Sequence, residues 1–133
     1  MSECIFCKIV RGEAHSWKVY EDEAVLAFLD IHPVSAYHTL VIPKNHYQNI
    51  FDVPEQELGQ VISIVRKVAR LYEAKLGIHH IQIVNSSGIE AQQDVFHLHF
   101  HIVPRHRGDH QNIVRKTYPE MVENFGELLD RLS

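Results

Sequence analysis

Histidine alternates with apolar residues in one short segment of the chain, VFHLHFHIV at 95–103. Side chains two residues apart lie on the same face of a β-strand. A strand here therefore places His97, His99 and His101 in a row. The apolar residues point to the opposite face and are expected in the core: Phe96, Leu98, Phe100 and Ile102. Imidazoles pack poorly because both ring nitrogens need partners, so the pattern predicts a sheet with one chemically active face.

Three interpretations of this histidine row are open. It could be an exposed polar face that happens to be rich in histidine. A metal-centred hydrolase would use the imidazoles as ligands. Nucleophilic catalysis would use one neutral imidazole to attack phosphorus, while its neighbours orient it and bind phosphate oxygens. Histidine titrates close to neutral pH, which favours the two chemical interpretations.

The remaining pattern indicates an α+β fold, with a mostly antiparallel five-stranded sheet, one long helix and a C-terminal helix. Runs of β-branched and apolar residues between turn residues predict the strands, at 17–21, 24–29, 38–43, 80–85 and 95–103. The C-terminal helix is expected near 119–132, with one apolar face.

Apolar residues at three- and four-residue steps predict the long helix, over about 54–76. Asp52 is its expected N-cap, and Gly77 is expected to end it. Ile62 and Leu76 belong to the stripe that should face the core.

Composition limits the partners. A chain of 133 residues suits a single domain over 1–133. The net charge is −4 and no basic stripe is present, which argues against a nucleic-acid polymer as partner. No window approaches the roughly 18 apolar residues of a membrane span. The opening MSECIFCKIV is unlike a secretory signal, so we expect no membrane partner and a cytoplasmic location.

The two cysteines, Cys4 and Cys7, are separated by two residues. This spacing allows both thiolates to reach one tetrahedral zinc ion, with histidine as the natural source of two more ligands. A redox pair or two idle thiols are the alternatives. A reducing compartment argues against a structural disulfide.

Several blocks of the sequence resemble the histidine triad (HIT) superfamily, in its Hint-like branch of bacterial proteins with an N-terminal zinc-binding cysteine pair. HLHFHIV at 97–103 has the pattern that defines the superfamily. The supporting blocks follow in the family's order: CIFCKIV at 4–10, VYEDE at 19–23, VLAFLDI at 25–31, HTLVIPKNH at 38–46 and VFHLHFHIVPR at 95–105. The resemblance is strongest over 4–107, and 108–133 forms a C-terminal tail.

The resemblance implies catalytic roles for three histidines. His99 would be the nucleophile, forming a covalent nucleotidyl-histidine intermediate that water hydrolyses. His101 would contact the phosphate and assist the leaving group. His38 would belong to the hydrogen-bonded network behind the nucleophile, although it could also be an ordinary strand histidine.

The resemblance also implies nucleotide contacts. Asp30 would hold the ribose hydroxyls, although Asp before Pro33 could simply form a turn. The apolar walls of the base site would be Phe6, Phe28 and Ile31, which could equally be plain core. The phosphate side would involve Asn85, Gln93, Asp94 and His101.

The metal ligands that the resemblance implies are Cys4, Cys7, His46 and His97. Four protein ligands make a closed, structural zinc site, which leaves His99 free and requires no catalytic metal. The other histidines are read as surface or turn residues: His15, His32, His79, His80, His106 and His110.

One departure from the family pattern lies directly before the triad, where the chain reads Ala91-Gln92-Gln93-Asp94. Relatives usually carry Gly-Gln-Ser or Gly-Gln-Thr there. Asp94 replaces a neutral hydroxyl donor, and a carboxylate repels phosphate.

The resemblance thus predicts a hydrolase or nucleotidyl transferase that acts on the α-phosphate of purine nucleoside phosphoramidates or related nucleotide conjugates. A dinucleoside polyphosphate hydrolase and a nucleotide-binding module with weak catalysis are the alternatives. The resemblance further implies a homodimer formed through the long helix and a strand edge.

Overall fold

The computed structural model describes residues 4–133. Five antiparallel strands form one sheet in the order β1-β2-β3-β5-β4. The strands are β1 (Lys18–Glu21), β2 (Val25–Leu29), β3 (Thr39–Pro43), β4 (Ile81–Val84) and β5 (Phe100–Pro104). The helices are α1 (Ile5–Val10), α2 (Glu55–Leu76) and α3 (Phe125–Asp130), with 3-10 turns η1 (Ile89–Ala91) and η2 (Pro119–Asn124). The predicted α+β class, with its five-stranded antiparallel sheet, is confirmed.

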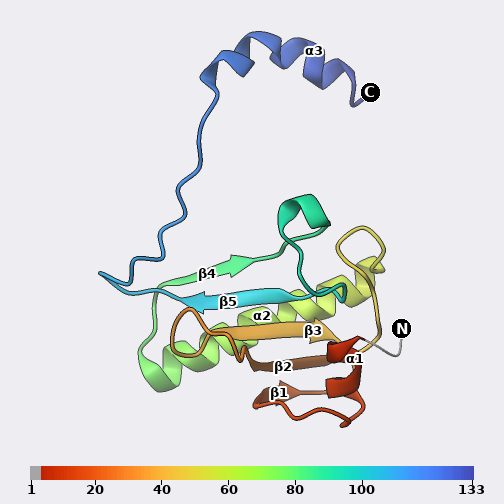
Figure 1. Ribbon diagram of the computed structural model, residues 1–133, viewed down its shortest axis with the longest axis vertical. Coiled ribbons are helices and arrows are strands. Elements are labelled where there is room, and N and C mark those ends of the chain that lie inside the picture. Colours follow the sequence, from red (N-terminus) through yellow and green to blue (C-terminus); the bar gives the residue numbers. More distant parts are fainter. Residues whose placement is uncertain (1–3) are drawn as a thin grey trace.

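Helices cover both faces of the sheet, very unequally (Figure 1). The 22-residue α2 packs against one face, where Val25, Val41 and Ile102 are buried. The six-residue α1 covers part of the other face, beside Leu26 and Ile42. Because both faces are covered, β2 and β3 are apolar along almost their whole length rather than alternating.

The C-terminal end of α2 agrees with the prediction, and its N-cap does not. Gly77 ends it as expected: its φ is 67° and its N–H donates to the Glu73 carbonyl. Asp52 is not the N-cap, since Pro54 takes that position. The Asp52 carboxylate instead accepts from the backbone N–H groups of Gln48 and Asn49, which fixes the loop before the helix.

The buried stripe of α2 is narrower than predicted. Ile62 and Leu76 are exposed, whereas Ile64 is buried against the sheet. A helix on one side of a sheet buries only the stripe that faces the strands, so apolar residues at its margins stay in solvent.

The triad segment enters the sheet later than predicted, because β5 begins at Phe100 rather than Val95. Before it, the Leu98 N–H donates to the Tyr47 carbonyl, which holds this stretch outside the regular ladder. Leu98, Phe100 and Ile102 are core residues as expected. Phe96 is not: it is 40% exposed, because its position lies beyond the strand.

The C-terminal tail runs away from the sheet past β4 (Figure 1). The predicted helix near 119–132 is shorter, with η2 followed by α3. Its apolar residues are exposed, including Phe125, Leu128 and Leu129. In residues 4–133 no helix combines the length and the apolar character that a bilayer crossing requires.

Candidate active site

A cavity of about 320 Å³ opens on the face of the sheet that α1 covers only in part. Its lining brings together most of the predicted nucleotide-site residues: Phe6, Phe28, Asp30, Ile31, Asp94, His99 and His101. His15 and His32, read from sequence as surface residues, also line it. Their exposure is as expected, but only the folded chain shows that they stand at this opening.

The backbone fixes the tautomer of His99. The ring donates from Nδ1 to the His97 carbonyl oxygen, 2.7 Å away. A neutral imidazole with its proton on Nδ1 has a lone pair on Nε2. That nitrogen belongs to a ring that is 4% exposed and lines the cavity. The geometry therefore provides a buried imidazole that is oriented by the backbone of the segment just before β5.

A chain of hydrogen bonds likewise fixes His38 and His101. The Val34 N–H donates to His38 Nδ1 (3.1 Å), so the proton of the neutral His38 ring lies on Nε2. This Nε2–H donates to His101 Nδ1 (2.9 Å). His101 must then carry its own proton on Nε2, which makes it a hydrogen-bond donor at the cavity.

Burial keeps both rings neutral. It is the main cause that lowers the pKa of His101 to about 4, with the neighbouring His99 and His38 adding to the effect. Burial also lowers the pKa of His38, which the Asp30 carboxylate partly offsets. Asp30 Oδ2 lies 3.4 Å from His38 Nε2.

Asp30 forms a turn and also borders the cavity. Its Oδ1 accepts from the His32 N–H (2.8 Å), as a turn-forming aspartate does. Its Oδ2 faces His38, and the residue lines the cavity. One carboxylate therefore shapes the turn after β2 and borders the site.

The apolar walls differ in burial. Phe6 and Phe28 are buried and meet edge to face, with ring centroids 5.5 Å apart. Phe6 also meets the His99 ring edge to face at 5.2 Å. Ile31 is 71% exposed at the rim of the cavity. An aromatic floor with an apolar rim suits a flat heterocyclic ring.

Asn85 and Gln93 lie behind the cavity rather than in its lining. The Asn85 amide donates to the His99 carbonyl (3.0 Å) and so supports the backbone of His99. The Gln93 amide is buried; it donates to the Gln48 and Val95 carbonyls and accepts from the Gly88 N–H. Both amides hold loops around the site.

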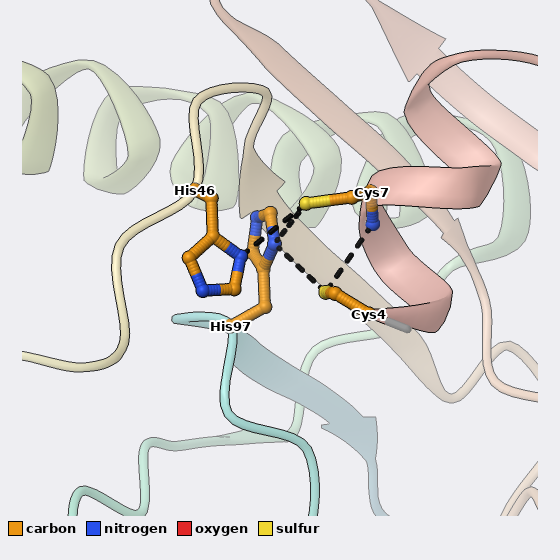
Figure 2. Close-up of side chains that lie close together, drawn as sticks. All are labelled: Cys4, Cys7, His46 and His97. Atoms are coloured by element: carbon orange, nitrogen blue, oxygen red, sulfur yellow. Dashed lines mark hydrogen bonds between the residues drawn. The ribbon is translucent and has the colours of Figure 1, made fainter. Parts of the chain in front are cut away.

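The second cluster joins Cys4, Cys7, His46 and His97, whose side chains converge in Figure 2. The two cysteines lie at the start of α1, a helix that the sequence analysis did not predict. His46 follows β3, and His97 precedes β5. Four side chains from three segments of the chain thus meet within ligand distance of one point.

The geometry of this cluster matches a tetrahedral metal site. His97 Nε2–H donates to the Pro43 carbonyl (2.8 Å), which leaves the Nδ1 lone pair facing the thiols. His97 Nδ1 lies 3.5 Å from Cys4 Sγ and 3.6 Å from Cys7 Sγ, and His46 Nδ1 lies 3.3 Å from Cys7 Sγ. Zinc bond lengths give a sulfur–nitrogen edge of about 3.5 Å in a tetrahedron. The residues therefore fit zinc.

Protonation at this cluster is consistent with metal binding. Burial lowers the pKa of His97 to about 4, so its ring is neutral at pH 7, which is the form that binds metal. Burial and the neighbouring Cys4 raise the pKa of the Cys7 thiol. A bound cation would reverse that and favour the thiolates.

Asp30, His38 and His101 also lie close enough to share an ion. The Val34 N–H bond to His38 Nδ1 argues against it, because it leaves the proton on the Nε2 that would have to bind the metal. His38 and His101 are therefore joined by a hydrogen bond, with the Asp30 carboxylate close by.

The HIT domain family model matches residues 11–108, so the chain belongs to the HIT family. An uncharacterized HIT-like protein from Methanocaldococcus jannaschii is 51% identical over 106 residues, which cover 80% of this chain and 81% of that protein.

Solved structures share the fold. A Zn-bound histidine triad family protein from Mycobacterium smegmatis has a TM-score of 0.79 and 34% identity, covering 99% of both chains. A HIT family hydrolase from Clostridium thermocellum has a TM-score of 0.72 and 34% identity, covering 86% of this chain and 99% of that one.

The low pKa of His101 makes stability depend on pH. The unfolded chain binds a proton at this ring below about pH 6.5, but the folded chain does so only near pH 4. The free energy of unfolding should therefore fall by about 2 kcal/mol between pH 7 and pH 5 because of this ring. Denaturant titrations should show that loss in the wild type and a correspondingly smaller loss in His101→Gln. Equal losses would mean that the folded ring accepts its proton as readily as the unfolded one.

Proposed function

We propose that this protein hydrolyses purine nucleoside phosphoramidates or related nucleotide conjugates at the α-phosphate. The observation that carries the proposal is the Nε2 lone pair of His99, which the His97 carbonyl fixes and the cavity exposes to a ligand. The description of a structural neighbour as a HIT family hydrolase supports the same reaction class.

The reaction would proceed in two displacements. His99 Nε2 attacks phosphorus, the bond to the leaving group breaks, and a nucleotidyl-histidine forms. Water then attacks phosphorus and returns the electron pair to Nε2. The protein needs no resident metal at phosphorus for either step.

The neighbouring residues would bind and orient the nucleotide. The His101 Nε2–H is placed to donate to a phosphate oxygen or the leaving group, and His38 holds it in that tautomer. Phe6, Phe28 and Ile31 would enclose the base, and Asp30 would accept from the ribose hydroxyls. Asn85 and Gln93 would act by supporting the surrounding loops.

Replacement of His99 tests the reaction directly. His99→Ala should lower kcat/KM for a fluorogenic adenosine phosphoramidate at least about a thousandfold, because the attacking atom is gone. Mass spectrometry after rapid mixing should show an adduct of nucleotide mass on wild-type His99. His79→Ala, which changes an exposed ring outside the cavity, should keep full activity.

The same assay separates the alternatives. Preferred turnover of a dinucleoside polyphosphate would identify that hydrolase activity instead. Tight AMP binding without turnover of either substrate would identify a nucleotide-binding module. Full activity in His99→Ala would contradict the proposed nucleophile.

We also propose that Cys4, Cys7, His46 and His97 hold a structural zinc ion that joins α1 to the triad segment. The four donor atoms lie within 4.8 Å of one another, and three of their sulfur–nitrogen distances suit a zinc tetrahedron. The zinc-bound relative also supports this proposal. All four positions are taken by protein ligands, so the ion would stabilise the fold without reaching the substrate. Two cysteines that form no disulfide suit the cytoplasm, where we place the protein.

Loss of one ligand should release the metal. Cys7→Ser should reduce zinc from one ion per chain to nearly none in elemental analysis. It should also lower Tm by more than about 5 °C, because the ion binds only the folded chain. His106→Ala, at an exposed histidine outside the cluster, should retain zinc and Tm. Unchanged zinc content in Cys7→Ser would exclude this ligand set.

We propose further that the whole chain of 133 residues acts as one unit and forms a homodimer through α2 and the β4 edge. In the described part of the chain, β4 has a strand partner on only one side. Ile83 lies there, 51% exposed, opposite the buried Ile102. The exposed apolar tail passes beyond the same edge (Figure 1). A second copy would cover these surfaces.

Sedimentation analysis tests the dimer. A charge at Ile83 would have to be buried in the interface, so Ile83→Asp should raise the dissociation constant at least about tenfold. Trp17→Asp is the matched control, because Trp17 is an exposed apolar residue beside the opposite edge strand, β1. A monomeric wild type, or equal effects of the two substitutions, would contradict the interface.

A further inference from the structure

Asp94 stands beside the nucleophile, where its charge bears on the group that leaves phosphorus. We infer that Asp94 makes the site selective for phosphoramidates whose leaving amine carries a second, positively charged group. The inference rests on the proposed function and names the substrate class more narrowly. It depends on the position of Asp94 and on the charges of the rest of the cavity.

The Asp94 carboxylate has no cationic partner among residues 4–133. Its Oδ1 lies 3.6 Å from His99 Nε2 and accepts from the Val95 N–H (2.8 Å). When Nε2 holds a lone pair, both atoms are acceptors and cannot bond to each other. The side chain is 78% exposed, so its charge faces whatever enters the cavity beside His99.

The other described residues of the cavity lining do not neutralise the negative charge of Asp94. Its lining within the described chain contains two carboxylates, Asp30 and Asp94, and no lysine or arginine. Burial keeps His101 neutral there. A substrate with several phosphates would bring additional negative charges into a site without a permanent cation. A leaving group that carries a cation would supply the missing partner.

The chemical step also favours a leaving group that carries positive charge. The His99 Nε2 lone pair forms the bond to phosphorus while the P–N bond breaks, and its electron pair goes to the amine nitrogen. That nitrogen takes a proton from water. The hydroxide so formed attacks phosphorus in the second step and returns the pair to Nε2, so one water is consumed in total. Because the nitrogen takes this proton while the P–N bond still holds, it carries positive charge in the transition state and leaves as a neutral amine, and a nearby carboxylate stabilises that charge.

An anionic leaving group would meet the opposite effect. Two like charges a few ångströms apart repel, and at a partly exposed site the effect on rate is about tenfold for each charge. Electrostatic interaction extends over several ångströms, so the sign of the effect does not depend on a direct contact with Asp94.

The test uses three adenosine phosphoramidates that share a primary amine on a short alkyl chain and differ at its far end. They are made from diaminopropane, aminopropanol and β-alanine, which end in a cation, a neutral hydroxyl and an anion. We expect wild-type kcat/KM to fall in that order. In Asp94→Asn the ratio between the cationic and anionic substrates should fall at least about tenfold. High salt should reduce the wild-type ratio.

Glu90→Gln is the matched control, because it removes an exposed carboxylate from η1, close in sequence to Asp94 but outside the cavity lining. It should leave the ratio unchanged. Normal turnover of the aminopropanol substrate with an unchanged ratio in Asp94→Asn would overturn the role of Asp94 alone. Failure of the wild type to hydrolyse any of the three would overturn the proposed function, and this inference with it.

Discussion

The site depends on one short contact, the hydrogen bond from His99 Nδ1 to the His97 carbonyl. It decides which nitrogen of the His99 ring is free, and it spans only two residues. The same His97 projects its side chain into the cysteine cluster, where the Pro43 carbonyl fixes the ring. His97 therefore orients the His99 ring through its backbone carbonyl and contacts the cysteines of α1 through its side chain. Displacement of His97 would disturb both centres together.

The sequence predicted the parts of the fold in which a local pattern and the tertiary environment agree. The sheet, the body of α2 and the stop at Gly77 followed from strand composition, helical period and glycine conformation. The failures occurred where contacts outside the repeating pattern decide the structure. Phe96 shares the alternating pattern of Leu98 but lies before the strand. Asp52 has a side chain suited to an N-cap, but its carboxylate accepts hydrogen bonds from the backbone N–H groups of Gln48 and Asn49 instead.

The candidate site was predictable as a list of residues and less so as an arrangement. Alternation placed His97, His99 and His101 on one face, and the family resemblance supplied their partners. No local pattern could show that His97 turns to the thiols while His99 faces the cavity, or that Val34 fixes the tautomer of His38. Helix α1 escaped notice because six residues are too few to show a helical period, although Cys4 caps it with its own sulfur.

The unequal covering of the sheet has a consequence for folding as well as for binding. Helix α2 closes one face, whereas α1 is too short to close the other, and the cavity is the area that α1 leaves bare. Phe6 and Phe28 belong to that second apolar layer and to the cavity wall alike. A flat ligand ring bound against these two side chains would complete the apolar layer. The affinity for the ligand and the conformational stability of the protein would then depend on the same contacts, so a substitution in this layer would alter both.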